Sequence, residues 1–202
     1  MILEGIVTTI GPDGAVNVAP MGPTVPSDTR LPLERFELRP FRTSRTFANL
    51  TAHPEGVLHV TDDVLLLARA AIGPIDPPPP LLPAATITGW LLADACRAYE
   101  FRITERDTSG DRAWFAAEVV RTHRLRDFFG FNRAKHAVLE AAILATRVGL
   151  LPPAEIAADF RRLAILVQKT GGPDEQAAFG LLQRFVEEEE REPQRTQRAQ
   201  RE

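Results

Sequence analysis

Apolar and β-branched residues dominate two runs near the start of the chain, over residues 3–10 and 15–25. Runs of this composition, bounded by turn residues, are typical of β-strands. Between the runs, residues 11–14 read Gly-Pro-Asp-Gly, in which glycine can adopt the positive φ that a tight turn requires. The pattern therefore predicts a β-hairpin.

The middle of the chain alternates between short apolar runs and turn residues. We expect strands over residues 33–41, 55–61, 92–105 and 112–123, and helices over residues 43–52 and 64–71. Thr43 and Ser44 offer hydroxyl caps for the first helix, and His53-Pro54 stops it. Residues 73–83 contain four consecutive prolines and are expected as an extended loop.

The hydrophobic period changes from two to that of a helix after Phe131. Asn132 is suited to cap a first helix rich in alanine, which reaches Ala145. Two further helices are expected, one opened by Pro152-Pro153 and the other by Pro173-Asp174. From Glu187 onward the chain is polar and charged, and we expect it to be frayed. Strands first and helices second indicate the α+β class.

Composition excludes several kinds of protein. The net charge of −3 among 202 residues gives no basic footprint for nucleic acid. The single cysteine, Cys96, rules out an intramolecular disulfide and a cysteine-based zinc site within one chain. Residues 1–5 lack the basic region of a signal peptide, and the most apolar window, residues 64–72, is too short to span a bilayer. We expect a cytoplasmic protein with neither nucleic acid nor membrane as partner.

The usual signatures of nucleotide-binding and hydrolase sites are missing from the sequence. His59, Asp62 and Asp63 come nearest to an acid–base or metal cluster. A strand places His59 and Asp62 on opposite faces, and Asp63 is better suited to cap the next helix. We therefore predict no metal site and assign no catalytic side chain.

Donors suited to an anion gather at the start of the expected helix over residues 43–52. Phosphate is bound by converging hydroxyls, by the free amides of a helix N-terminus and by cations. This segment supplies these groups from Arg42, Thr43, Ser44, Arg45 and Thr46. The alternative is an ordinary capped helix with solvated arginines.

Two other segments leave a choice open. Asn17 could hydrogen-bond a flat ring, and Pro20-Met21-Gly22 could let the backbone approach it closely, or the strand could simply end in a proline–glycine turn. In the alanine-rich helix, Arg133 or Arg147 could reach an anion. The apolar face of that helix is suited to packing in a bundle or in a dimer.

Three stretches of the sequence resemble a family of domains of unknown function, number 447, whose members adopt the FMN-binding split β-barrel of flavin reductases. The first stretch is EGIVTT at residues 4–9, followed by DG and NVAPMG at 13–14 and 17–22. The second is PFRTSRTFANL at residues 40–50, leading to VTDD at 60–63. The third is FNRA at residues 131–134, with EAAI and TR at 140–143 and 146–147. His59 departs from the asparagine expected there.

The resemblance implies an FMN-binding split-barrel domain over residues 1–130. We expect the helical segment over 131–190 to pack on it, because three phenylalanines at 128, 129 and 131 call for burial. The charged residues 191–202 are expected to form a disordered tail. The resemblance also implies a homodimer with FMN at the interface and a link of some relatives to tetrahydromethanopterin-dependent one-carbon metabolism. The Thr46-x-x-Asn49 spacing is similar to that near the flavin-reductase phosphate site. The implied cofactor-binding residues are Asn17, Pro20, Met21, Gly22, Arg42, Thr43, Ser44, Arg45, Thr46 and Asn49.

A flavin carries its own redox chemistry, so no acid or base need be visible in such an oxidoreductase. The sequence leaves two alternatives open. One is a protein that binds flavin or another anionic ligand without turnover. The other is a dimerisation module whose helical half docks a partner.

Overall fold

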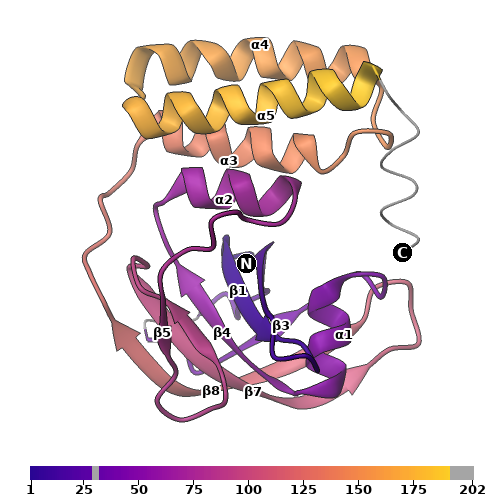
Figure 1. Ribbon diagram of the computed structural model, residues 1–202, viewed down its shortest axis with the longest axis vertical. Helices are drawn as coiled ribbons and strands as arrows, with labels where there is room; N and C mark the ends of the chain where they lie inside the picture. The colour runs from indigo at the N-terminus through magenta and orange to yellow at the C-terminus, as the bar shows by residue number, and fades with distance from the viewer. Residues whose placement is uncertain (29–31, 192–202) are drawn as a thin grey trace. The chain divides into compact units, whose positions relative to one another are not determined.

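The computed structural model describes residues 1–28 and 32–191 and divides the chain into two compact units (Figure 1). The barrel unit comprises Met1–Asp62 and Pro77–Phe128, and the helical unit comprises Asp63–Asp76 and Phe129–Glu202. The predicted α+β class is confirmed. Among the helices of the described residues, none is long and apolar enough to cross a membrane.

The barrel unit is built on a six-stranded antiparallel sheet in the order β2-β1-β4-β7-β8-β3. Its strands are β1 (Gly5–Ile10), β2 (Val16–Met21), β3 (Arg35–Leu38), β4 (Glu55–Val60), β7 (Arg97–Asp107) and β8 (Trp114–Arg124). The hairpin of β1 and β2 is confirmed, with Gly14 at φ 79° in the turn. Thr24, just after β2, exchanges backbone hydrogen bonds of 2.9 and 2.8 Å with Glu37 of β3. This bridge joins the two ends of the sheet, so the barrel closes at one point.

Alternation along the strands sends one set of side chains into an apolar core. Phe36 of β3 and Phe101 of β7 meet there edge to face, with ring centroids 5.2 Å apart. Gly56 of β4 makes room for this pair, because a Cβ there would lie 2.8 Å from the Phe101 ring and 2.9 Å from the carbonyl oxygen of Thr8. The core therefore requires glycine at this strand position.

A two-stranded flap replaces part of the loop expected over residues 73–83. It pairs β5 (Leu81–Pro83) with β6 (Trp90–Leu92). The predicted strand over residues 92–105 was wrong at its start, since a turn over residues 93–96 separates β6 from β7. The alternation missed this break because apolar residues continue through both strands.

The helical unit contains α2 (Val64–Ile72), α3 (Arg133–Ala145), α4 (Pro153–Thr170) and α5 (Pro173–Arg191). Helix α3 packs against α2, α4 and α5, and Figure 1 shows α3, α4 and α5 running side by side. Six apolar positions of α3 are buried, namely Ala134, Ala137, Val138, Ala141, Ala142 and Ala145. This face of α3 is therefore part of the core and is not an open dimer surface. The sequence pattern did not indicate that α2 belongs with these helices.

Two polar side chains tie the ends of these helices together. Asn132 Oδ1 accepts from the backbone N–H groups of Ala134 and Lys135 at 2.8 and 3.1 Å, and its Nδ2 donates to the carbonyl of Thr170 at 3.1 Å. Glu175 accepts from Gly172 N–H at 2.8 Å and pairs with Lys135 at 2.9 Å. The start of α3, the end of α4 and the start of α5 are thus joined.

Two expectations about the second half were wrong. The frayed tail was expected from Glu187, but α5 continues to Arg191; residues 192–202 lie outside the described residues. The phenylalanines between the units were expected to be buried, yet Phe128, Phe129 and Phe131 are 50%, 74% and 94% exposed. That the helical segment packs on the barrel as one folding unit stays a prediction.

Replacing Asn132 should destabilise the chain through lost hydrogen bonds alone. Asn132→Ala removes a helix cap and the bond to Thr170, so we expect the free energy of unfolding to fall by about 1–3 kcal/mol. Asn132→Asp keeps the cap and loses only the bond to Thr170, so its loss should be smaller. Urea unfolding followed by circular dichroism measures both. Equal stabilities of the two variants and the natural protein would contradict the assignment.

Candidate functional site

The residues predicted to bind phosphate lie at the start of helix α1 (Arg45–Ala52). Ser44 is its N-cap: the hydroxyl accepts from Phe47 N–H at 3.2 Å and donates to the carbonyl of Phe41 at 2.7 Å. The Ser44 side chain is thus used in the cap itself. The backbone N–H groups of Arg45 and Thr46 open the helix, where no intrahelical acceptor exists for them. These two amides remain suited to an anion.

The structure brings Asn17 and Thr46 together, 29 residues apart in sequence, whereas Pro20 and Met21 lie at the other end of β2. Asn17 of β2 donates from Nδ2 to the Thr46 hydroxyl at 3.1 Å. Asn49, one turn along α1, donates to the Thr9 hydroxyl of β1 at 3.0 Å. Thr46 and Asn49 are both 3% exposed, so α1 is fixed on the hairpin by polar bonds shielded from water.

These hydrogen bonds decide which of the predicted residues can still bind a ligand. Asn49 is occupied in holding the helix. The Thr46 oxygen accepts a hydrogen bond from Asn17, but its own O–H can still donate. Asn17 keeps its amide oxygen and a second N–H. Thr43 is exposed beside the cap.

The second candidate segment forms the end of an edge strand. Pro20 and Met21 are the last residues of β2, which is half-buried and pairs only with β1 over residues 16–21. Pro20 is tolerated there because an edge strand need not donate on its open side. Gly22 follows, and a Cβ on it would meet the side chain of Ile2 at 2.9 Å. The need for glycine at this position thus comes from the N-terminal segment.

Three guanidinium groups lie near the start of α1. Arg42 and Arg45 are exposed and, within the described residues, neither has an ion-pair partner. The third is Arg112, whose Cζ lies 4.0 Å from the ring centroid of Phe41. Sequence reasoning missed Arg112, and no local signal marks it: it reaches Phe41 only through the isolated β-bridge between them.

His59, the position that departs from the family pattern, is structural. Its ring is fully buried, with Nδ1 3.1 Å from the carbonyl of Ile6 and Nε2 accepting from Leu92 N–H at 3.0 Å. This pattern requires the proton on Nδ1. Burial lowers the pKa of His59 to about 4, so the ring is neutral and joins β1, β4 and the flap.

Glu100 binds the loop that connects β5 with β6. Its buried carboxylate accepts from the N–H groups of Ala85 and Thr86 at 2.7 Å each and lies 2.6 Å from His123 Nε2. Burial raises the pKa of Glu100, but the hydrogen bonds from these partners outweigh it and the pKa is lowered. The carboxylate is therefore charged and anchors the loop. Within the described part of the chain, no group of three or more metal-ligating side chains is found.

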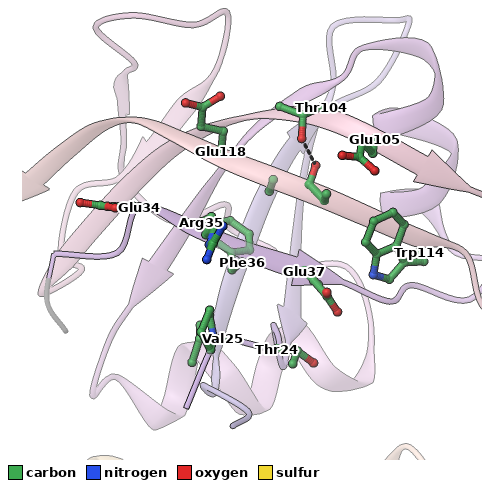
Figure 2. A pocket seen from close by; sticks show the side chains of 13 residues that line it. Thr24, Val25, Glu34, Arg35, Phe36, Glu37, Thr104, Glu105, Trp114 and Glu118 are labelled. Atoms are coloured by element: carbon green, nitrogen blue, oxygen red, sulfur yellow. Dashed lines mark hydrogen bonds between the residues drawn. The ribbon is translucent and has the colours of Figure 1, made fainter. Parts of the chain in front are cut away.

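The outer face of β3 and β8 carries a hollow of about 680 Å³ (Figure 2). Figure 2 shows Trp114 flanked by Glu37 and Glu105, with Glu34 and Glu118 on the far side. Arg35 is the single cation among the lining residues. Four carboxylates against one guanidinium disfavour a phosphate, so an anionic ligand is better placed at α1.

Arg133 and Arg147 do not form a joint site. They stand at opposite ends of α3, about 20 Å apart at 1.5 Å per residue. Both are exposed, and Arg147 borders a hollow between α3 and α4 that also includes Glu140 and Asp159. One phosphate cannot bridge the two arginines.

A closed antiparallel barrel with a capped helix on its first hairpin defines the class of split-barrel proteins. Two family models match the chain: "Protein of unknown function (DUF447) N-terminal domain" over residues 3–126 and "Protein of unknown function (DUF447)" over residues 132–184. The chain belongs to the DUF447 family. Among curated proteins, no significant match to it is found.

Solved structures share the fold. The FMN-bound DUF447 protein MM1853 from Methanosarcina mazei is 22% identical, with a TM-score of 0.77 over 91% of this chain and 94% of its own. Flavin reductase HpaC complexed with NADP+ is 19% identical, with a TM-score of 0.53 over 65% and 82%. The NADH:FAD oxidoreductase SgcE6 of Streptomyces globisporus C-1027 is 17% identical, with a TM-score of 0.50 over 60% and 74%. The predicted split-barrel fold with a C-terminal helical part is confirmed.

The neutral His59 makes stability depend on pH in a defined window. Because its folded pKa, about 4, lies below the ordinary 6.5, the stabilisation is complete above pH 6.5 and is lost as pH falls toward 4. We expect the free energy of unfolding to drop by about 2 kcal/mol from pH 7 to pH 5 through this group. His59→Gln, which does not titrate, should lack that part of the decrease. Urea unfolding of both proteins at the two pH values measures it; parallel decreases would refute the assignment.

Proposed function

We propose that the chain is a flavoprotein that binds FMN, with the phosphate at the start of α1 and the ring along the end of β2. The observation that carries the proposal is the Asn17–Thr46 hydrogen bond, which places the start of β2 against the start of α1, so that a ligand held at the helix start can extend along β2. FMN has the two parts that these segments suit, an anionic phosphate and a flat polar ring. The FMN named in the description of MM1853 supports the same assignment.

The donor set at α1 fits a phosphate. It comprises two exposed guanidinium groups, the Thr43 hydroxyl and the amides of Arg45 and Thr46. Cations and free amides together bind phosphate without an enclosing cage, and the helix dipole adds to the attraction. Asn17 would supply polar contacts to the ring, and Met21 an apolar one.

Bound FMN supplies hydride and electron transfer, which need no protein acid or base. We therefore propose an oxidoreductase of the flavin-reductase type, acting on a small molecule. The NADP+ and NADH in the descriptions of HpaC and SgcE6 favour a nicotinamide electron donor. The protein's own part is to hold the phosphate, orient the ring and limit access of water. A binding protein without turnover is the alternative, because it needs the same pocket.

FMN affinity should depend on the arginines at α1. Loss of a charge-assisted hydrogen bond costs roughly 1.5–3 kcal/mol, so Arg42→Ala or Arg45→Ala should weaken FMN about tenfold to a hundredfold. Thr46→Ala should cost about 1 kcal/mol, since it removes a neutral donor. Quenching of flavin fluorescence gives each dissociation constant.

Riboflavin provides the control because it has the ring but no phosphate. Its affinity should hardly change in either arginine variant. If both variants keep the FMN affinity of the natural protein, or weaken riboflavin equally, the phosphate lies elsewhere. Turnover is tested separately, by oxidation of NADH or NADPH with the FMN-loaded protein; no oxidation of either would favour the binding protein.

We also propose that the protein is a homodimer. The exposure of Phe128, Phe129 and Phe131 supports this, since clustered exposed aromatic residues mark interaction surfaces. Sedimentation velocity at micromolar concentration should give twice the mass of the chain, and the double substitution Phe129→Ser with Phe131→Ser should shift the protein toward monomer. A natural protein that sediments as a monomer with flavin bound would refute a shared interface site.

A further inference from the structure

A guanidinium from a distant part of the chain is fixed beside the proposed phosphate site. Arg112 belongs to the connection between β7 and β8, and its guanidinium carbon lies over the ring of Phe41, 4.0 Å from the ring centroid. The two residues form an isolated antiparallel bridge, and Ala113 N–H donates to the carbonyl of Pro40 at 3.1 Å. Backbone pairing therefore holds Arg112 next to residue 41.

Phe41 in turn belongs to the turn that starts α1. Its carbonyl oxygen accepts from Ser44 N–H at 3.0 Å and from the Ser44 hydroxyl at 2.7 Å. The ring under the guanidinium and the helix cap are thus parts of one short segment. In Figure 1 the connection between β7 and β8 lies next to α1, in agreement with the bridge.

Stacking leaves the donors of Arg112 available. A guanidinium held over an aromatic face by a cation–π contact can still use its N–H donors for an anion. Arg112 is exposed, and among the described residues no carboxylate pairs with it. A mobile exposed arginine loses rotamer freedom when it binds an anion, whereas a stacked one has already lost part of it.

We infer that Arg112 is a phosphate-binding residue that gives the site its preference for phosphorylated over unphosphorylated flavin. This inference rests on the proposed FMN site and adds to it a residue 66 positions beyond the Thr46 of the motif. Arg112 is the pre-organised cation of the site, and the ring of Phe41 is its platform. The ligand chemistry that it recognises is a terminal phosphate monoester.

Four variants test the assignment. Arg112→Ala removes the cation, Arg112→Lys keeps a charge without the planar fork, and Phe41→Leu removes the platform. Arg121→Ala is the matched control: Arg121 is an exposed arginine of β8, roughly 23 Å along the strand from its first residue, Trp114, at about 3.3 Å per residue. Dissociation constants for FMN and riboflavin are measured by fluorescence quenching at low and at moderate salt.

We expect Arg112→Ala to weaken FMN about tenfold to a hundredfold and to change riboflavin affinity less than about twofold. Arg112→Lys and Phe41→Leu should fall between this variant and the natural protein, because each keeps part of the interaction. The salt dependence of FMN binding should be smaller in Arg112→Ala, and Arg121→Ala should match the natural protein.

The outcomes separate this inference from the proposed function. If the natural protein binds FMN tightly and Arg112→Ala binds it equally well, the role of Arg112 is overturned and the FMN site stands. Equal weakening of FMN and riboflavin by Arg112→Ala also overturns it, since that indicates a merely structural role. Natural protein that binds no FMN refutes the proposed function itself.

Discussion

The attachment of α1 to the first hairpin is the interaction on which the proposed site depends. Asn49 and Thr46 face the hairpin and are satisfied by Thr9 and Asn17, in surroundings where a lost hydrogen bond has no water to replace it. The helix therefore cannot rotate about its axis without leaving buried polar groups unpaired. That constraint keeps its first two amides and the neighbouring arginines at one end of the hairpin.

A second set of buried polar groups fixes the flap. Thr8 donates to the carbonyl of Trp90 at 2.6 Å, while His59 and Glu100 bind backbone groups further along the same segment. These three side chains come from β1, β4 and β7, so this face of the sheet holds buried polar groups among apolar ones such as Val57 and Ala98. The neutral His59 and the charged Glu100 are each stable in their buried positions because each pairs with backbone groups that would otherwise be unsatisfied.

Charge in the barrel unit is separated by site. Arg42, Arg45 and Arg112 lie near the start of α1, whereas the hollow on β3 and β8 holds four glutamates with Arg35. Such a separation attracts an anion to one place and repels it from another, although the chain as a whole carries only −3. The overall charge of the sequence therefore gave no indication of an anion site.

The sequence by itself determined the local elements. Apolar and β-branched runs located β1, β2 and β4, and alternation located β8. Ser44 and Asn132 marked the starts of α1 and α3, and helical spacing found α4 and α5. These features could be predicted because strand period, helix caps and turns are set by neighbouring residues. The resemblance to the family added the order of these elements and the residues around α1.

Only the tertiary structure decided which distant groups meet. The pairing of Asn17 with Thr46, the stacking of Arg112 on Phe41 and the burial of His59 between Ile6 and Leu92 each join segments at least 29 residues apart. The flap was missed for the same reason, since β5 and β6 are very short strands held by side chains from other strands. The hydrophobic period of a segment indicates which side of its strand or helix is buried. Which other segment that side contacts depends on how the whole sheet closes.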